Sequence, residues 1–257
     1  MSPLYEDVFA FCLAQLADTP RRPLVIGIQG PQGAGKSTLT RALLDELPAH
    51  GLSGATVSVD DFYMTRAGQL EVAAAHPGNP YLEHRGYPGT HDVDLGADTL
   101  ERLAAGHRDV RIPVYDKSAH AGRGDRAPMD AWRPAPSPLD IVFVEGWMFG
   151  FTPVSESSLT DPHLIPTNRA LADYERWYQH IDAWVILRAL DPNYVLTWRV
   201  EAEERMKATG KPGLSREDIE DYIRRFIPAY RTWGGAPKGV AAERQFELRV
   251  GLDRQKS

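Results

Sequence analysis

Short hydrophobic runs alternate with longer stretches of mixed polarity along this chain of 257 residues. The runs are rich in β-branched residues, as buried strands are, and the mixed stretches carry apolar residues at helical spacing. We expect strands at LVIGI (24–28), VRIPVY (110–115), LDIVFVEGW (139–147), DAWVILRAL (182–190) and QFELRVGL (245–252). Another strand is expected within ATVSVDDF (55–62) and should end at Asp60. We expect helices over residues 4–17, 37–47, 94–106, 170–182, 191–208 and 215–227. Strands that alternate with helices predict an α/β domain with a mainly parallel sheet.

Two of the predicted helices stand together between the last two strands. Asp191 and Pro192 are a suitable N-cap and first position for the earlier one, and TGKPG (209–213) separates it from the later one. A helical pair in this position can cover a site at the edge of the sheet. We therefore expect a lid at about residues 192–231.

The composition narrows the classes of function. The formal net charge is -6, with 42% hydrophobic and 25% charged residues, which is ordinary for a globular protein. An acidic chain is poorly suited to bind nucleic acid or an anionic membrane surface, and no run approaches the roughly 18 apolar residues of a membrane span. The single cysteine, Cys12, cannot form an intramolecular disulfide. With no visible signal peptide, we expect a cytoplasmic monomer or homodimer that acts on a small molecule.

A glycine-rich motif follows the first predicted strand and precedes a predicted helix. GPQGAGKST fits the pattern G-x-x-x-x-G-K-[ST], in which inward-facing amide groups and the helix N-terminus form a phosphate cradle. Its lysine reaches the β- and γ-phosphates, and its serine hydroxyl ligates Mg²⁺. The residues expected to bind ATP are Gly30, Pro31, Gln32, Gly33, Ala34, Gly35, Lys36, Ser37 and Thr38. The motif predicts a three-layer sandwich of the P-loop NTPase type, with a five-stranded, mainly parallel sheet and a helical lid, in a single domain over 1–257.

A carboxylate on the Mg²⁺ side is expected at the end of another strand. Glu145 ends the apolar run IVFVEG, and the carboxyl ends of strands in an α/β sheet converge on the ligand. We therefore expect Ser37 and Glu145 to form the metal site. The other interpretation is that Glu145 caps a helix.

Motifs outside the glycine-rich loop indicate which type of nucleotide enzyme this is. The chain has no N-K-x-D motif for reading guanine, and its charge opposes a DNA-linked motor. A small-molecule kinase needs a base for the acceptor hydroxyl, and Asp60 and Asp61 stand at the end of the second predicted strand. Strand alternation would point them to opposite sides, and we expect Asp60 to be the base. Alternatively, the two residues only cap a helix.

Phosphoryl transfer also needs cations near the transferred group. The predicted lid supplies Arg199, Arg205 and Lys207. We expect the two arginines to assist catalysis when the lid closes.

The order of these motifs resembles that of the phosphoribulokinase/uridine kinase/pantothenate kinase superfamily. Within it, the chain is more similar to plant-type D-glycerate 3-kinases. The stretches that carry the resemblance are GPQGAGKST, VDDFY, NPYLEHRGYPGTHD, VYDKSAHAGRGDRA, VEGWMFGF, DAWVILRALDPNYVLTWRVEAE and IPAY. They span most of the chain, although RTWGGAPKGVAAERQF after Tyr230 matches weakly.

The resemblance implies transfer of the ATP γ-phosphate to the 3-hydroxyl of D-glycerate, with Mg²⁺. It implies that Asp60 is the base and that Glu145 is the acid of the metal site. The segment that contacts the acceptor in uridine kinases corresponds here to Tyr115, Asp116 and His120. A different kinase of the superfamily and a nucleotide-dependent regulatory protein remain the alternatives.

D-Glycerate has one carboxylate and two hydroxyl groups, and each needs polar partners. Arginine and lysine suit the carboxylate, and the candidates are Arg85, Lys117, Arg123 and Arg126. The candidates for the hydroxyl groups are Asp61, Tyr63, His91, Tyr115 and His120. Several of them lie in the long connection 64–92, which we expect to be functional.

Overall fold

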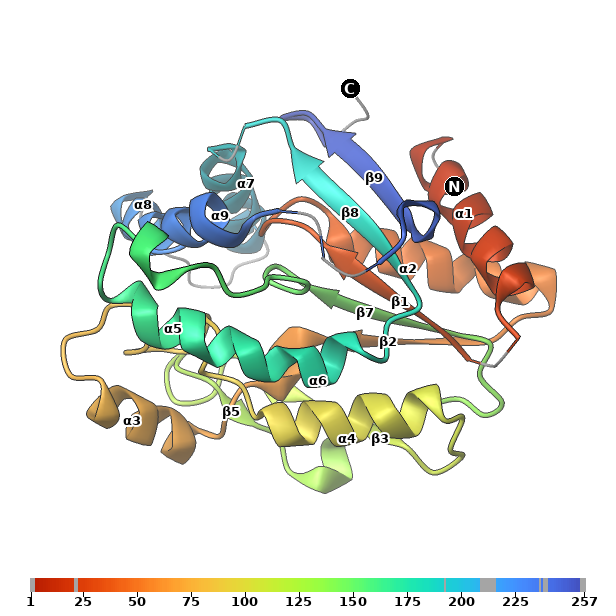
Figure 1. The fold of residues 1–257 in the computed structure, drawn as a ribbon, viewed down its shortest axis with the longest axis horizontal. Helices are drawn as coiled ribbons and strands as arrows, with labels where there is room; N and C mark the ends of the chain where they lie inside the picture. Colours follow the sequence, from red (N-terminus) through yellow and green to blue (C-terminus); the bar gives the residue numbers. More distant parts are fainter. Residues whose placement is uncertain are drawn as a thin grey trace.

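One parallel sheet of five strands organises the chain (Figure 1). The computed structural model describes residues 3–20, 23–191, 193–208, 216–235, 237 and 240–254. The strand order is β2-β7-β1-β8-β9, and every neighbouring pair is parallel. The strands are β1 (Leu24–Gln29), β2 (Gly54–Ser58), β7 (Ile141–Gly146), β8 (Ala183–Ala189) and β9 (Gln245–Val250). The predicted α/β class and parallel sheet are thereby confirmed.

Helices cover both faces of this sheet. The helices of the described residues are α1 (Pro3–Asp18), α2 (Lys36–Glu46), α3 (Arg66–Ala75), α4 (Val93–Ala104), α5 (Leu164–Ala170), α6 (Glu175–Tyr178), α7 (Tyr194–Ala208), α8 (Arg216–Arg224) and α9 (Ile227–Trp233). Two antiparallel pairs of short strands lie outside the sheet: β3 (Arg111–Ile112) with β6 (Arg133–Pro134), and β4 (Tyr115–Asp116) with β5 (Asp125–Arg126). Among the described residues, no helix is long and apolar enough to cross a membrane.

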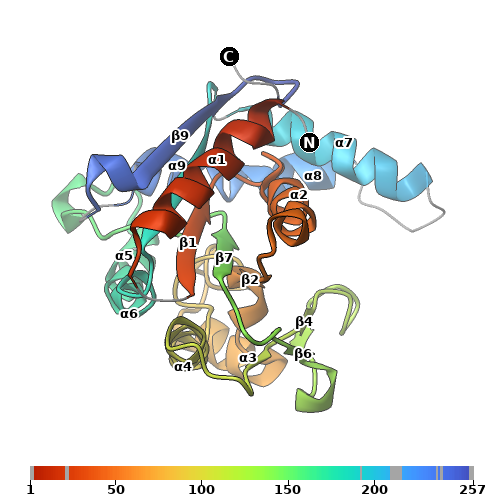
Figure 2. The same cartoon turned by 90° about the vertical axis from the view of Figure 1, so that its right-hand side faces the viewer.

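Alternate residues of the central strands feed two separate hydrophobic cores. On β7, Val142 and Val144 join a core with residues of α4, α6 and α9, while Ile141 and Phe143 join one with residues of α1, α2 and α7. Strand side chains alternate between the faces, so a strand with a helical layer on each side is apolar throughout. Figure 2 shows α1 and α2 on one side of the sheet and α4 and α6 on the other.

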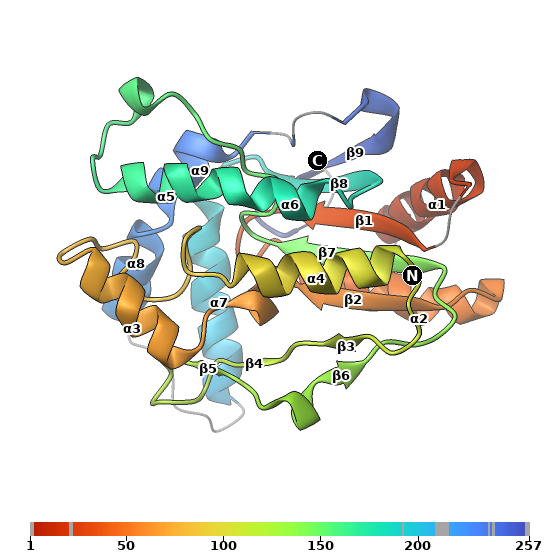
Figure 3. The same cartoon turned by 60° about the horizontal axis from the view of Figure 1, so that its bottom comes forward.

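All five strands end at the same edge of the sheet, and the lid helices lie beyond that edge. Figure 3 shows α7 and α8 past the arrowheads of β2 and β7. This is the region predicted to form the lid, except that Pro192 and residues 209–215 lie outside the described part of the chain.

Several predicted boundaries are wrong for identifiable reasons. The second strand ends at Ser58, because the Ser58 side chain accepts a hydrogen bond from the Asp60 amide and caps a 3₁₀ turn over Val59–Phe62. Strand alternation therefore does not apply to Asp60 and Asp61. Where a helix is expected over 170–182, a 3₁₀ turn (Leu171–Tyr174) follows the end of α5, and α6 ends at Tyr178. The connection 64–92 contains α3, which Thr65 caps by accepting from the Gly68 amide.

The tight contact between β1 and β8 generates a stability prediction. A Cβ added at Gly27 would lie 2.5 Å from the buried Trp184 ring, and overpacking of this kind costs about 1–3 kcal/mol. Gly27→Ala should lower the free energy of unfolding by that amount in urea denaturation followed by circular dichroism. Gly235→Ala is the matched control, because its added Cβ meets no atom within 4 Å. Equal stability of the two variants would contradict the close packing.

Candidate active site

The loop between β1 and α2 folds as its glycine spacing predicts. Gly33 and Gly35 have φ values of +80° and +96°, in the left-handed region that glycine tolerates. At Gly33 an added Cβ would also lie 2.6 Å from Cβ of Trp198 on α7. Within the described chain no side chain caps the N-terminus of α2, so its first amide groups can bind a phosphate.

The Lys36 side chain folds back over the first half of this P-loop. Its Nζ donates to the carbonyl oxygens of Gly30 at 2.7 Å and Pro31 at 3.1 Å. Burial lowers the pKa of the Lys36 ammonium, while the carboxylates of Glu145 and Asp60 oppose that shift. The P-loop therefore holds a cation within the electrostatic reach of both acidic groups.

Ser37 and Glu145 bring two oxygen atoms together where α2 begins and β7 ends. The Ser37 hydroxyl donates to Oε1 of Glu145 at 3.3 Å. Mg²⁺ prefers oxygen ligands, and in nucleotide sites it uses one or two protein groups together with phosphates and water. This donor set fits Mg²⁺, and the two residues predicted to form the metal site are neighbours.

Asp60 forms an ion pair with a residue of the acceptor segment, the stretch VYDKSAHAGRGDRA (114–127) that holds Lys117 and other predicted acceptor residues. The Lys117 ammonium lies 2.5 Å from Oδ2 of Asp60. Burial by itself would raise the pKa of the Asp60 carboxyl, but the ammonium groups of Lys117 and Lys36 oppose that rise, and the pKa lies below its usual value. Asp60 is therefore ionised at neutral pH, as a base must be.

Asp61 has different partners. Its Oδ1 accepts from the Tyr115 amide at 3.2 Å, and its Oδ2 pairs with Arg133 at 3.3 Å. Burial raises the pKa of this carboxyl, and the Tyr115 and Arg133 contacts oppose the rise. In this arrangement Asp61 anchors the acceptor segment to the end of β2.

Tyr63, His91 and Tyr115 form a compact aromatic cluster close to Asp60. The Tyr63 ring stacks on His91 with centroids 4.3 Å apart and meets the Tyr115 ring edge-on at 5.4 Å. Burial lowers the pKa of His91 to about 3, so its ring is neutral at physiological pH. His91 Nε2 and Tyr115 Oη are buried and have no hydrogen-bond partner in the described residues. Buried polar atoms are normally satisfied, so these two atoms can receive a polar ligand.

Arg85 organises the backbone of the acceptor segment. Its guanidinium donates to the Gly122 carbonyl at 2.9 Å, contacts the Arg123 carbonyl, and lies 5.5 Å from the centroid of the Tyr115 ring. The segment is sharply curved here, since residues 120–122 and 124 all have positive φ. Arg85 thus lies beside the aromatic cluster.

The remaining predicted acceptor residues contact other protein groups. His120 pairs with Asp125 at 3.0 Å, and Arg123 contacts the ring of His84. Their contacts are therefore with the segment's own residues and with the connection 64–92. The structure does not bring them to Asp60.

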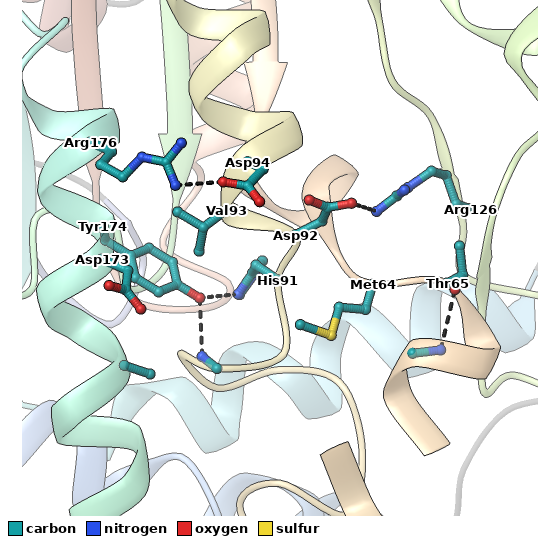
Figure 4. A pocket seen from close by; sticks show the side chains of 13 residues that line it. Met64, Thr65, His91, Asp92, Val93, Asp94, Arg126, Asp173, Tyr174 and Arg176 are labelled. Atoms are coloured by element: carbon teal, nitrogen blue, oxygen red, sulfur yellow. Dashed lines mark hydrogen bonds and ion pairs between the residues drawn. The ribbon is translucent and has the colours of Figure 1, made fainter. Parts of the chain in front are cut away.

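Arg126 lies at a separate cavity of about 570 Å³, drawn in Figure 4. It pairs with Asp92 at 2.9 Å, and Arg176 pairs with Asp94 at 2.6 Å across the same cavity. His91 also lines this cavity, and its Nδ1 lies 2.7 Å from the Tyr174 hydroxyl. Among the described residues, those lining it include neither Asp60 nor any P-loop residue.

The predicted lid cations are only partly described. Arg199 is half-buried on α7, and Lys207 is exposed near the end of that helix. The Arg205 side chain lies outside the described part of the structure. The catalytic roles of Arg199 and Arg205 stay predictions.

Arg254, which sequence reasoning missed, contacts the P-loop from the C-terminal side. Its Nε donates to the Gly33 carbonyl at 2.8 Å, and its Nη1 pairs with Glu201 of α7 at 2.7 Å. Its guanidinium also lies over the Trp198 ring, 5.4 Å from the centroid. It follows β9 with no motif around it, so the sequence gives no signal of this contact.

Arg254→Ala should weaken nucleotide binding, because the P-loop carbonyl and Glu201 both lose a charged partner. We expect about a tenfold rise in the dissociation constant for ATP, the effect of losing one charge-assisted hydrogen bond, measured by calorimetric titration. Arg249→Ala is the matched control, since Arg249 pairs only with Glu247 among the described residues and is 66% exposed. Unchanged ATP affinity in the Arg254 variant would show that the contact does not support the loop.

Known proteins share both the sequence and the fold. The model of the phosphoribulokinase/uridine kinase family matches residues 25–159. The chain is 41% identical over 245 residues to the chloroplastic D-glycerate 3-kinase of Arabidopsis thaliana, covering 89% of this chain and 53% of that protein. It is 40% identical over 222 residues to an uncharacterized kinase of Schizosaccharomyces pombe, covering 81% and 80% respectively. The chain thus spans about half the length of the plant relative and most of the yeast one.

A solved structure matches along the whole chain. The D-glycerate 3-kinase of Cryptococcus neoformans superimposes with a TM-score of 0.92 at 32% identity, covering 100% of this chain and 98% of that one. The predicted P-loop kinase fold is confirmed by this likeness. Together with the family match, it shows that the chain belongs to the phosphoribulokinase/uridine kinase family.

Proposed function

We propose that this protein is an ATP-dependent D-glycerate 3-kinase. It would transfer the γ-phosphate of ATP to the 3-hydroxyl of D-glycerate and release 3-phosphoglycerate and ADP. The observation that carries the proposal is the end-to-end likeness to a D-glycerate 3-kinase of known structure. The P-loop, the Ser37–Glu145 pair and the Asp60–Lys117 pair supply the chemistry that such a reaction needs.

The nucleotide side uses the P-loop and the metal pair. The amide groups at the start of α2 bind the phosphates, and Lys36 offers its ammonium to the β- and γ-phosphates after leaving the Gly30 carbonyl. Ser37 and Glu145 would hold Mg²⁺, which neutralises charge on the phosphates when it is bound.

The proton of the acceptor hydroxyl passes to Asp60. The hydroxyl oxygen forms a bond to the γ-phosphorus while the bond from that phosphorus to the β–γ bridging oxygen breaks. The hydroxyl proton moves to the Asp60 carboxylate, and the bonding electrons leave with ADP. Lys117 stabilises the ionised form of Asp60 beforehand, and it can turn to the carboxylate of glycerate.

The acceptor side is suited to a small, strongly polar molecule. Lys117 offers positive charge at Asp60, Arg85 lies over the Tyr115 ring, and the unpartnered His91 Nε2 and Tyr115 Oη are available for polar contacts. Arginine and lysine at this position favour a carboxylate. The expected cytoplasmic location and the monomeric or dimeric state stay predictions.

An acceptor screen tests the proposal. The purified protein is assayed for ADP release with ATP and Mg²⁺ against D-glycerate, L-glycerate, uridine and pantothenate, and phosphorus NMR identifies the position of phosphorylation. D-Glycerate should be the best acceptor and 3-phosphoglycerate the product. Preference for uridine or pantothenate would assign a different kinase activity. Nucleotide binding without turnover of any acceptor would favour a regulatory role.

Asp60→Asn should reduce turnover strongly, because the amide cannot accept the proton. We expect a loss of roughly 10²–10⁴-fold in kcat, with nearly unchanged affinity for ATP. Asp61→Asn is the matched variant at the next position and should lose less, since Asp61 holds Tyr115 and Arg133. A larger loss in the Asp61 variant would transfer the role of base to that residue.

Lys117→Met should move the acid limb of the pH profile. Lys117 lowers the pKa of Asp60, so its removal raises that pKa and leaves the base protonated up to a higher pH. The acid limb of kcat/KM for the acceptor should shift to higher pH. Arg108→Met, which removes an exposed charge elsewhere, should leave the limb in place. A limb that stays fixed in the Lys117 variant would mean that another group controls it.

A further inference from the structure

A tyrosine of the lid region lies directly on the P-loop. The Gln32 amide donates to the Tyr230 hydroxyl at 3.0 Å. Tyr230 is half-buried on α9, 198 residues away along the chain. Amide groups of a P-loop serve to bind phosphates, so this hydroxyl lies where a phosphate is recognised.

The contact lies at the end of the loop that receives the terminal phosphate. Lys36 Nζ is bonded to the carbonyl groups of Gly30 and Pro31, which directly precede Gln32. The lysine of a P-loop serves the β- and γ-phosphates. The Gln32 amide and the Tyr230 hydroxyl are therefore on the γ-phosphate side of the site.

The Tyr230 ring is held from two sides. It packs edge-on against Trp147, with centroids 5.5 Å apart, and Trp147 follows Glu145 of the metal site by two positions. The C-terminal end of α9 is tied to the sheet, because the side chains of Gln29 and Arg188 donate to the carbonyls of Gly235 and Gly234. The hydroxyl thus has a fixed position relative to β1, β7 and β8.

We propose that Tyr230 recognises the γ-phosphate of ATP. A tyrosine hydroxyl offers one donor and two acceptor positions, so it can accept from Gln32 and donate to a γ-phosphate oxygen at the same time. This contact is available with ATP and is lost with ADP. Tyr230 would therefore favour binding of the substrate nucleotide over the product nucleotide.

The proposal rests on ATP-dependent kinase activity and not on the identity of the acceptor. Binding is accordingly measured without any acceptor, by calorimetric titration with Mg²⁺ and either ADP or the nonhydrolysable analogue adenylyl imidodiphosphate. Tyr230→Phe keeps the ring contact with Trp147 and removes only the hydroxyl. It should weaken analogue binding about tenfold, as expected for a lost hydrogen bond to a charged group, and change ADP binding less than twofold.

Tyr178→Phe is the matched control. The Tyr178 hydroxyl also forms a hydrogen bond with the main chain, by donating to the Phe151 carbonyl. Tyr178 lies on α6 and does not contact the P-loop in the described structure, so the affinities for the analogue and for ADP should both stay unchanged. Equal weakening of both nucleotides in the Tyr230 variant would mean that the hydroxyl only orders the loop, and would overturn the proposal. Unchanged affinity for both would overturn it as well.

A measurement on the unmodified protein removes any dependence on the folding of the variant. In ¹⁵N-labelled protein, the Gln32 amide resonance should shift when the analogue replaces ADP, because the hydroxyl that it contacts gains a charged partner. The same resonance position with both nucleotides would contradict the proposal. An absence of D-glycerate turnover would leave both binding results intact and would affect only the proposed acceptor.

Discussion

The register of three neighbouring parallel strands sets the distances in this site. β1 pairs with β7 so that Ile28 is level with Glu145, and β2 pairs with β7 so that Ser58 is level with the same residue. The P-loop follows β1 directly, and the turn that carries Asp60 follows β2. Because β2, β7 and β1 are neighbours joined by parallel pairing, their carboxyl ends cannot move apart without opening the sheet. The P-loop, Glu145 and Asp60 are therefore positioned by hydrophobic packing.

The sequence was informative where function is encoded in neighbouring residues. The spacing of Gly30, Gly35, Lys36 and Ser37 determines the loop, and the apolar run before Glu145 determines a buried strand that ends at the site. These features depend on main-chain conformation and strand burial, which local sequence controls. The fold class and the family followed from them.

Contacts between distant loops could not be predicted in the same way. The pairing of Lys117 with Asp60 depends on how the segment after β4 curves back, which four residues with positive φ help to determine. Arg126 likewise has partners that are distant along the chain, since its guanidinium pairs with Asp92 and donates to the Tyr63 carbonyl. The stretch IPAY, which contains Tyr230, could be identified from the sequence as similar to the family. That the Tyr230 hydroxyl contacts the P-loop could be seen only in the structure.

The packing of Trp198 against the P-loop also has a mechanical consequence. Val195 and Trp198 are fully buried, and the Trp198 indole donates to the Leu252 carbonyl at 2.7 Å. A Cβ added at Gly33 would lie 2.6 Å from Cβ of Trp198, so the loop and the helix are in close contact. The N-terminal turns of α7 are thus held in place by packing, while the rest of the helix extends away from the P-loop. Any swing of this helix must either begin beyond Trp198 or carry the P-loop tip with it. A movement that includes Trp198 would therefore displace the P-loop together with α7.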